Sequence, residues 1–329
     1  MPSPDTNNPI TPLCWAPDIL PGFEQITLQC APAADGPVDI VLVRRRVNAE
    51  RSQGAAVLYL HGFIDYFFQS HLADFYLAQG LDFYALDLRR HGRSLRPWQR
   101  PNFTASIDEY LTDVAQAVRL LQAQEGVTWL LLNGHSTGGL VAALYAHRGE
   151  GRAAVKALFL NSPFLDMNLP PWQARFAEPL VAALGRPFPY LRLPGLSPAY
   201  AQSIHADHHG EWRFDTRWKP IEGFPIYAGW FRAIHRAQAE VADGLNIEVP
   251  CLLLHAEQSR WPKHWCEDAM GADTVLNVAD MRRLGPGLGK QVEIHAIEGG
   301  MHDLVLSRPA VREGVWARLG DWLQRCRPS

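Results

Sequence analysis

The chain has few cysteines and no long apolar run, and neither sign of charge dominates it. Its 329 residues include 5 scattered cysteines without CxxC spacing, which argues against a disulfide framework, a zinc site or redox chemistry. Such thiols predict a cytoplasmic protein. No run of 18 or more apolar residues occurs, so we expect no transmembrane segment. The formal charge of −3 gives no reason to expect nucleic acid or an anionic membrane as a partner.

The amino-terminal stretch "MPSPDTNNPITPLCWAP" is polar and rich in proline, without a basic start or an apolar centre. We therefore expect that it is not a secretory signal. The composition, with 47% hydrophobic and 20% charged residues, is that of a globular protein with a sizeable core.

Short apolar runs recur along the chain and predict the strands of a sheet. They are residues 56–62, 83–89, 129–136, 155–163, 249–257 and 292–300. Runs that are apolar on both faces are typical of buried parallel strands. Before them, "FEQITLQC" and "VDIVLVRRR" alternate apolar and polar residues, which predicts an antiparallel pair at a sheet edge. With helical patterns between several runs, the sequence predicts an α/β fold with a mostly parallel, eight-stranded sheet flanked by helices.

Two further segments can be assigned from composition and spacing. "SIDEYLTDVAQAVRLLQAQ" predicts a helix with Ser106 as N-cap and Glu109 at the capping-box position. Residues 164–247 are dense in proline and aromatic residues and separate two strands, so we expect an inserted cap over the carboxyl ends of the strands. The core would then be residues 1–163 and 248–329. The large cap aromatics are Trp172, Phe176, Tyr190, Tyr200, Trp212, Trp218, Trp230 and Phe231.

The stretch "NGHSTGG" contains a G-x-S-x-G pattern centred on Ser136, at the end of an apolar strand and the start of an apolar-striped helix. This is the setting of a nucleophile elbow, in which a side chain at Gly134 or Gly138 would crowd the sharp turn. An oxyanion hole needs two backbone donors. We expect them to be the N–H groups of Thr137 and of Phe63, in the loop after the strand "LYLHG", where His61 has a structural role.

A serine nucleophile needs a neighbouring base, usually a histidine. Of 13 histidines, His302 in "IEGGMHDL" follows the last predicted strand and precedes the last helix, and is the expected base. His295 lies within that strand and is predicted to be a packed or surface residue. His205, His208 and His209 of the cap have a spacing that could suggest a metal, but no supporting ligand accompanies them.

By these motifs the chain resembles the α/β-hydrolase superfamily, more narrowly its lysophospholipase and monoacylglycerol-lipase-like (serine aminopeptidase S33-like) group. The matching stretches are "LYLHGF", "ALDLRRHGRS", "GHSTGG" and "GGMHDL", in the order that the family has them. The resemblance covers about residues 20–327 apart from the cap. It implies the α/β-hydrolase fold and hydrolysis through a serine, and it leaves the substrate open. The polar residues of "DLRRHGRS" are expected to tie loops together.

The acid that should orient His302 is not where the resembling family has it. In the resembling family an aspartate directly follows the sixth parallel strand, but here Ser259 stands at that place. "ADTVLNV" reproduces the family's pattern further on, so we predict an insertion at 258–271 and Asp273 as the acid. Asp273 could instead be only the N-cap of the next helix, and Asp268, Glu257 and Asp280 are rivals. We expect Asp303 to fix its own loop.

The expected activity is hydrolysis of carboxylic esters with medium or lipophilic acyl groups, through an acyl-enzyme and without metal or cofactor. The partner would be a small-molecule or lipid ester, with lysophospholipid and monoacylglycerol as the substrates that the resemblance implies. Amide or peptide hydrolysis, acyl transfer to an acceptor other than water, and a non-catalytic binding role are the alternatives. Substrate-binding residues and oligomeric state stay open, although Ser203 could face the site.

Overall fold

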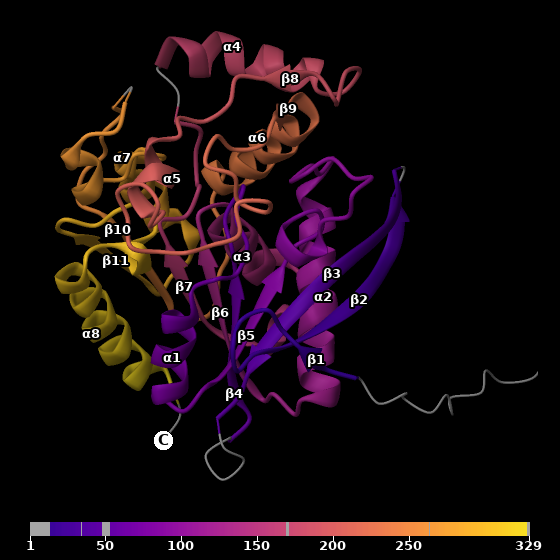
Figure 1. Cartoon of the computed structure of the whole chain (residues 1–329), viewed down its shortest axis with the longest axis vertical. Helices are drawn as coiled ribbons and strands as arrows, with labels where there is room; N and C mark the ends of the chain where they lie inside the picture. Colours follow the sequence, from indigo (N-terminus) through magenta and orange to yellow (C-terminus); the bar gives the residue numbers. More distant parts are fainter. Residues whose placement is uncertain (1–13, 34, 48–52, 169–170, 263, 328–329) are drawn as a thin grey trace, which may run out of the picture.

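The computed structural model describes residues 14–33, 35–47, 53–168, 171–262 and 264–327, with the backbone but not the side chains of 171–176. A large sheet crosses the molecule, with helices on both faces (Figure 1). Within the described residues it has nine strands in the order β1-β2-β3-β5-β4-β6-β7-β10-β11. These are β1 Ala16–Pro17, β2 Glu24–Ala33, β3 Gly36–Arg45, β4 Ala55–Leu60, β5 Asp82–Asp87, β6 Trp129–His135, β7 Val155–Asn161, β10 Cys251–Ala256 and β11 Val292–Ile297.

The sheet is mostly parallel, as the apolar runs predict. Strands β5, β4, β6, β7, β10 and β11 all run parallel to one another, whereas β2 and β3 form the predicted antiparallel pair. Strand β3 joins that pair to β5 in antiparallel register, with Val43 opposite Ala85. The strand beyond the predicted eight is β1, which pairs with the start of β2. Its two residues are too short to show a periodicity.

Two hydrophobic cores lie on opposite faces of the sheet. Successive residues of a strand point to opposite faces, so Leu58 and Leu60 of β4 enter one core while Val57 and Tyr59 enter the other. The first core is covered by α2 Ile107–Gln124, α3 Thr137–Arg148 and α7 Val278–Leu284, and the second by α1 Ser70–Ala78 and α8 Pro309–Cys326. Five short 3₁₀ segments complete this part: η1 Gly92–Ser94, η2 Arg152–Ala154, η3 Glu267–Gly271, η4 Gly285–Leu288 and η5 Leu304–Leu306.

The start of α2 differs in one detail from its predicted capping box. The Ser106 hydroxyl is the N-cap and accepts a hydrogen bond of 3.2 Å from the Asp108 N–H. The Glu109 carboxylate does not return to Ser106. It accepts instead from the Ala105 N–H at 3.4 Å and from Arg89 at 3.1 Å. Arg89 of the neighbouring loop therefore binds the Glu109 carboxylate that a capping box would direct to the Ser106 N–H.

The segment between β7 and β10 lies above the sheet in Figure 1, with α4 at the top and α5 lower. Its elements are α4 Pro171–Leu184, β8 Arg192–Leu193, α5 Ala199–Ile204, β9 Ile226–Tyr227 and α6 Ala228–Ala242. The carboxyl-terminal half of α6 places Ile234, Ala237 and Val241 in the first core. The division at 164–247 remains a prediction. Of the predicted cap aromatics, the side chains of Trp172 and Phe176 lie outside the described part.

Polar contacts fasten this segment to loops at the carboxyl ends of the strands. The Trp212 indole N–H donates to the Leu306 carbonyl at 2.9 Å, and the Tyr66 hydroxyl accepts from the Asp215 N–H at 2.7 Å. These bonds join positions far apart in the sequence, so the segment is fixed over that end of the sheet.

The loop "DLRRHGRS" ties neighbouring loops together, as its polar residues predict. The Asp87 carboxylate accepts from the Phe67 and Arg93 N–H groups, both at 2.9 Å. The Arg93 guanidinium reaches Asp87 at 2.9 Å and Asp18 at 2.7 Å, with all three side chains buried. Each buried charge thus has an opposite charge beside it, which is the condition for keeping it in the interior.

Within the described residues, no helix is long and apolar enough to cross a membrane. The thiols of Cys30, Cys251, Cys266 and Cys326 are free. Residues 1–13, which carry most of the stretch predicted not to be a secretory signal, lie outside the described part.

Candidate active site

Ser136 stands alone between the end of β6 and the first residue of α3. Its backbone has φ 54° and ψ −119°, a conformation that residues with a side chain rarely adopt. The adjoining glycines are required by space: a Cβ on Gly134 would lie 2.3 Å from the Gly138 carbonyl oxygen, and one on Gly138 would lie 2.3 Å from that of Leu60. The elbow geometry expected from G-x-S-x-G is therefore present, and it presents the Ser136 hydroxyl at the carboxyl end of the sheet.

His302 follows β11 and meets this hydroxyl. Its Nε2 lies 3.0 Å from Ser136 Oγ, within hydrogen-bonding distance of a proton to be abstracted. Ser136 is 7% exposed and His302 3% exposed, so the pair is nearly closed off from water. The His302 ring is flanked by His135, with ring centroids 4.8 Å apart, and by the edge of Tyr200 at 5.3 Å and 82°. These rings hold the imidazole in place from two sides.

Asp273 contacts the other nitrogen of the same ring. One carboxylate oxygen, Oδ2, lies 2.9 Å from His302 Nδ1, and the side chain is fully buried. The other oxygen, Oδ1, accepts from the N–H groups of Val275 at 2.8 Å and Leu276 at 2.7 Å. With Oδ1 fixed by its own loop, Oδ2 is directed at the imidazole. The following helix α7 is capped by Asn277, which accepts from the Ala279 N–H at 3.1 Å, and not by Asp273.

Ser259 lies just after β10, and the chain returns to this point at Asp273. Ser259 and Asp273 face each other in an isolated parallel bridge, in which the Asp273 N–H donates to the Gln258 carbonyl and the Arg260 N–H to the Asp273 carbonyl, both at 2.9 Å. The Ser259 hydroxyl donates to the Leu276 carbonyl at 2.8 Å. The bridge brings Asp273 to the end of β10, as an insertion ahead of the acid requires. The insertion itself stays a prediction.

The rival carboxylates lie elsewhere. Asp268 is exposed on η3, and Glu257 is exposed at the end of β10. Asp280 pairs with Arg283 at 2.9 Å on α7. Within the described part of the chain, none of the three hydrogen-bonds to His302, whereas Asp273 does.

Asp303 follows the histidine but serves its own loop, as expected. Its carboxylate accepts from Asn161 Nδ2 at 2.7 Å, from the Val305 N–H at 3.2 Å and from Gln69 Nε2 at 3.3 Å. It therefore anchors the loop that carries His302 to β7 and to the start of α1.

The loop after β4 lies against the serine. A Cβ on Gly62 would be 3.1 Å from Ser136 Cβ, so the next residue, Phe63, begins beside the nucleophile. Among the described residues, the Phe63 N–H donates to no other group. The Thr137 N–H is the first of α3 and has no acceptor within the helix. Neither of the two N–H groups expected as oxyanion donors is thus engaged within its own loop or helix.

Two other side chains of this loop have structural contacts. His61 Nε2 accepts from the Leu88 N–H at 3.0 Å and its Nδ1 lies 2.8 Å from the Gly62 carbonyl, which bears out a role in fixing the loop. The Phe63 ring is stacked on Trp230 of α6, with centroids 3.9 Å apart and planes inclined by 27°. An aromatic pair therefore joins the loop after β4 to the segment above it.

A buried ion pair makes a second link between the same two parts. Lys219 Nζ lies 2.8 Å from Asp65 Oδ1, and the side chains are 7% and 4% exposed. Burial alone would raise the pKa of Asp65, but the Lys219 ammonium, helped by His135 and His61, brings that pKa below its usual value. Asp65 is two residues from Phe63, so the pair holds the loop after β4. Nothing in the sequence around Lys219, "RWKPIEG", signals this contact.

The two rings that flank His302 are uncharged. Burial lowers the pKa of His135, so its imidazole is neutral at physiological pH. Burial likewise raises the pKa of Tyr200 well above its usual value. Tyr200 was predicted only as one of several cap aromatics, and no local pattern indicated that it would contact the base.

The three cap histidines have other contacts. His205 Nδ1 accepts from the Asp207 N–H at 3.2 Å, and His209 stacks on Trp265. In the described part of the chain, no three His, Cys, Asp or Glu side chains are placed to hold a metal. The Ser203 hydroxyl donates to the Ala199 carbonyl at 2.8 Å within α5, so it is engaged by its own helix.

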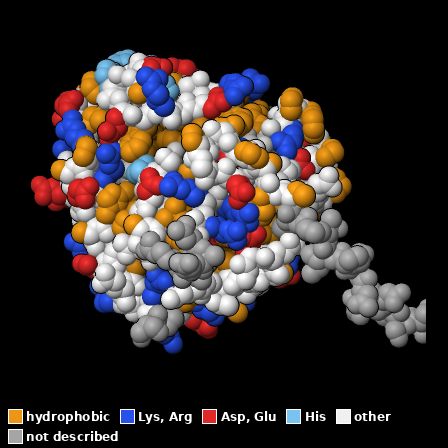
Figure 2. Space-filling view, turned by 60° about the horizontal axis from the view of Figure 1, so that its bottom comes forward, with side chains coloured by type: hydrophobic (Ala, Val, Ile, Leu, Met, Phe, Trp, Pro, Cys, Tyr) orange, Lys and Arg blue, Asp and Glu red, His pale blue; other side chains and the backbone are white. Residues whose placement is uncertain are grey.

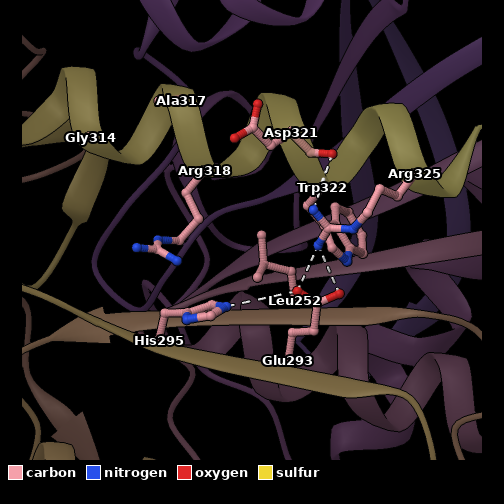
Figure 3. A pocket seen from close by; sticks show the side chains of 9 residues that line it. All are labelled: Leu252, Glu293, His295, Gly314, Ala317, Arg318, Asp321, Trp322 and Arg325. Atoms are coloured by element: carbon pink, nitrogen blue, oxygen red, sulfur yellow. Dashed lines mark hydrogen bonds and ion pairs between the residues drawn. The ribbon is translucent and has the colours of Figure 1, made fainter.

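Two surface hollows lie away from this site. One of about 410 Å³ lies between β11 and α8 and contains His295, whose ring is half-buried and 3.8 Å from Glu293 (Figure 3). His295 is therefore a surface residue, as predicted. The other, of about 680 Å³, is lined by His147, Arg152 and Lys156. Neither hollow is lined by Ser136, His302 or Asp273.

The sheet order, the strained serine between β6 and α3, and the histidine after the last strand define the α/β-hydrolase fold. Solved structures share this fold over most of their length. A soluble variant of monoglyceride lipase from Saccharomyces cerevisiae in complex with a substrate analog matches with a TM-score of 0.67 and 17% identity, covering 92% of this chain and 96% of that one. DcsB in complex with its substrate analogue matches with a TM-score of 0.64 and 18% identity, covering 92% and 100%.

The chain belongs to the family described as serine aminopeptidase, S33, whose model matches residues 51–308. Among characterised relatives it is similar to the bifunctional esterase/perhydrolase DCH of Acinetobacter calcoaceticus, with 35% identity over 226 residues. The match covers 62% of this chain and 73% of the relative. The resemblance inferred from the motifs is therefore confirmed at the level of fold and family.

Proposed function

We propose that the protein is a serine hydrolase that cleaves carboxylic esters with lipophilic or medium acyl groups through an acyl-enzyme. One observation carries the proposal: Asp273, His302 and Ser136 form a continuous chain of contacts of 2.9 and 3.0 Å that ends on the elbow serine. Such a chain is what activates a hydroxyl that is otherwise a weak nucleophile at neutral pH.

In the first half-reaction, His302 Nε2 takes the proton of Ser136 Oγ as the oxygen attacks the ester carbonyl. The negative charge that develops on the carbonyl oxygen is held by the N–H groups of Phe63 and Thr137. Asp273 stabilises the imidazolium and keeps its Nδ1 proton in place. His302 then donates its Nε2 proton to the leaving alkoxide oxygen, which releases the alcohol and leaves the acyl group on Ser136.

In the second half-reaction, water replaces the alcohol. His302 takes a proton from the water as its oxygen attacks the acyl carbonyl, and the same two N–H groups hold the oxyanion. Return of that proton to Ser136 Oγ releases the carboxylic acid and restores the enzyme. The sequence of steps uses no metal or cofactor.

The surroundings of the site favour an apolar acyl group. Phe63 and Trp230 stack beside the oxyanion loop, and Tyr200 covers the base. Apolar and aromatic walls with a few polar groups are typical of sites for apolar ligands. Lysophospholipids and monoacylglycerols are the first substrates to test, in line with the monoglyceride lipase among the similar structures. The free thiols support a cytoplasmic location as part of this proposal.

The family and one relative support an alternative acceptor or an alternative scissile bond. The family is described as a serine aminopeptidase, and the relative is an esterase/perhydrolase. The same acyl-enzyme could form from an amide, or be attacked by an acceptor other than water. A panel of esters and amides with one acyl group, assayed in water and with hydrogen peroxide, ranks these reactions directly.

A fluorophosphonate probe tests the mechanism itself. We expect it to label the wild-type protein and not Ser136→Ala, and we expect that variant to lose about 10⁶-fold in kcat on p-nitrophenyl esters of increasing chain length. If folded wild-type protein is neither labelled nor active on any ester, the proposed ester hydrolysis is refuted and a binding role is supported.

A further inference from the structure

An apolar patch covers the outer surface of the segment above the sheet. Nine large hydrophobic side chains of the described part are exposed, and six of these come from residues 180–196. We call these six the cap patch: Leu180, Leu184, Phe188, Tyr190, Leu191 and Leu196. Phe188 is 59% exposed and Leu180 61%. Scattered exposed hydrophobic residues are normal, but a gathering of this size marks an interaction surface.

The patch is an ordered surface. The Phe188 N–H donates to the Leu184 carbonyl at 3.0 Å and the Leu191 N–H to the Phe188 carbonyl at 3.1 Å, so the chain turns without a break after α4. The Ala228 N–H of α6 donates to the Leu191 carbonyl at 2.9 Å. Below, Glu178 of α4 lies 2.7 Å from His235 of α6. The apolar side chains are thus held outward by polar contacts on the inner side.

Basic side chains lie in and around the patch. Arg186 and Arg192 lie within it and are exposed. Arg100 lies 3.9 Å over the Tyr190 ring, and Arg232 donates to the Ala182 carbonyl at 3.4 Å. None of the four is within salt-bridge distance of a carboxylate among the described residues, and residues 179–206 contain no Asp or Glu.

This local charge differs from that of the whole chain, whose formal charge is −3. At the end of the molecule turned forward in Figure 2, basic and acidic side chains are interspersed. From the net charge of the whole chain we expected no anionic membrane as partner. That net charge does not reveal the basic and apolar region at the opposite end of the molecule. In Figure 1 this region is α4 and β8, at the top, beyond the carboxyl ends of the strands.

We propose that the cap patch docks on the surface of a phospholipid bilayer that contains anionic lipids. Apolar side chains that enter the interface, with arginines around them for the headgroups, are the combination that peripheral membrane binding requires. A second protein copy would need acidic groups to meet these arginines, and the patch itself has none to offer. Docking here turns the carboxyl end of the sheet, with Ser136, toward the bilayer. The proposal concerns binding and does not depend on the proposed hydrolysis.

Vesicle flotation tests the proposal with the full chain. We expect the protein to float with vesicles of phosphatidylcholine and phosphatidylglycerol at about 3:1, and at least tenfold less with phosphatidylcholine alone. Arg186→Gln combined with Arg192→Gln should weaken binding to the anionic vesicles about 25-fold, since each basic residue near such a surface contributes about fivefold. Phe188→Ser combined with Leu191→Ser should weaken it at least tenfold, because two half-exposed apolar side chains no longer enter the interface.

Matched controls separate the patch from general surface properties. Ile19→Ser removes a hydrophobic side chain that is 57% exposed in the turn between β1 and β2. Arg152→Gln combined with Arg318→Gln removes two arginines that also lack a carboxylate partner in the described part and lie at the two hollows. Both controls should bind the anionic vesicles within twofold of wild type. The thermal midpoint of each variant confirms that it is folded.

Three results would overturn the proposal. The first is absence of flotation of the wild-type protein with anionic vesicles, and the second is equal binding by the patch variants and the controls. The third is a wild-type dimer in sedimentation velocity that Phe188→Ser with Leu191→Ser dissociates while vesicle binding is unchanged. That last result would assign the patch to a second copy of the chain.

Discussion

Lys219→Met should destabilise the folded protein by several kcal/mol, because it leaves the Asp65 carboxylate buried without its counter-charge. The two charged groups are 2.8 Å apart, and their side chains are 7% and 4% exposed. Removing one partner of a buried pair costs about 3–5 kcal/mol. Methionine keeps the length and apolar body of the lysine, so the lost charge is the main change.

An exposed ion pair of the same segment is the control. Arg213 and Asp207 are 3.1 Å apart, with side chains 76% and 65% exposed. Solvent screens such a pair, so Arg213→Met should cost less than about 1 kcal/mol. The contrast between the two variants isolates burial, because each removes one cation from one close pair.

The pH dependence of the Lys219→Met deficit gives a second check. In the wild type the pKa of Asp65 lies below its usual value, so the carboxylate's contribution is fully present above the unfolded pKa of about 3.9 and is lost as pH falls through the lower folded value. Without Lys219, burial raises that pKa. The carboxyl then takes up a proton on mild acidification, and the deficit should be largest at pH 7 and smaller at pH 5.

The measurement is urea unfolding followed by circular dichroism at both pH values, with linear extrapolation to water. Asp65→Asn combined with Lys219→Met removes both charges and should recover most of the lost stability. The reasoning is refuted if Lys219→Met costs no more than Arg213→Met, or if the double variant is as unstable as the single one.

The other predictions concern the site and its supports. Asp273→Asn should lower kcat about 10³–10⁴-fold while Asp268→Asn leaves it within twofold, and the reverse order in an ester assay would move the acid to η3. Gly138→Ala should prevent folding or abolish ester hydrolysis, since its Cβ would stand 2.3 Å from the Leu60 carbonyl; a stable variant with wild-type activity contradicts this. Asn277→Ala should lower the free energy of unfolding in urea by about 1 kcal/mol with kcat unchanged, and a loss of activity would mean that the N-cap of α7 also positions Asp273.

The parts of the fold and site that follow from local pattern could be predicted. Ser136 and His302 each stand in a short motif at the end of an apolar strand, and parallel strands bring those ends to one edge of the sheet. The placement of Asp273 is harder to predict, because several carboxylates follow β10 and only the likeness of "ADTVLNV" to the pattern of the resembling family favours one of them. Its contact with His302, 29 positions away, depends on how the intervening chain folds.

The supports of the site carry no local signal. Lys219 and Asp65 are 154 positions apart, and neither lies in a pattern that marks an ion pair. The stack of Phe63 on Trp230 and the edge of Tyr200 on His302 likewise join separate parts of the chain. Aromatic content predicted that the segment would be apolar, but which of its rings meets the base depends on the packing of the whole segment.

The bridge between Ser259 and Asp273 has a consequence for how this enzyme can change during evolution. The bridge fixes both ends of the loop, at Ser259 and at Asp273. The loop between these two residues can therefore be shortened, extended or replaced without moving the Asp273 carboxylate. The entropy of closing such a loop rises only slowly with its length. Substitutions in this loop, including at Trp261, which is 56% exposed, can thus accumulate independently of the active site. Selection to keep Asp273 in place acts instead on the bridge itself.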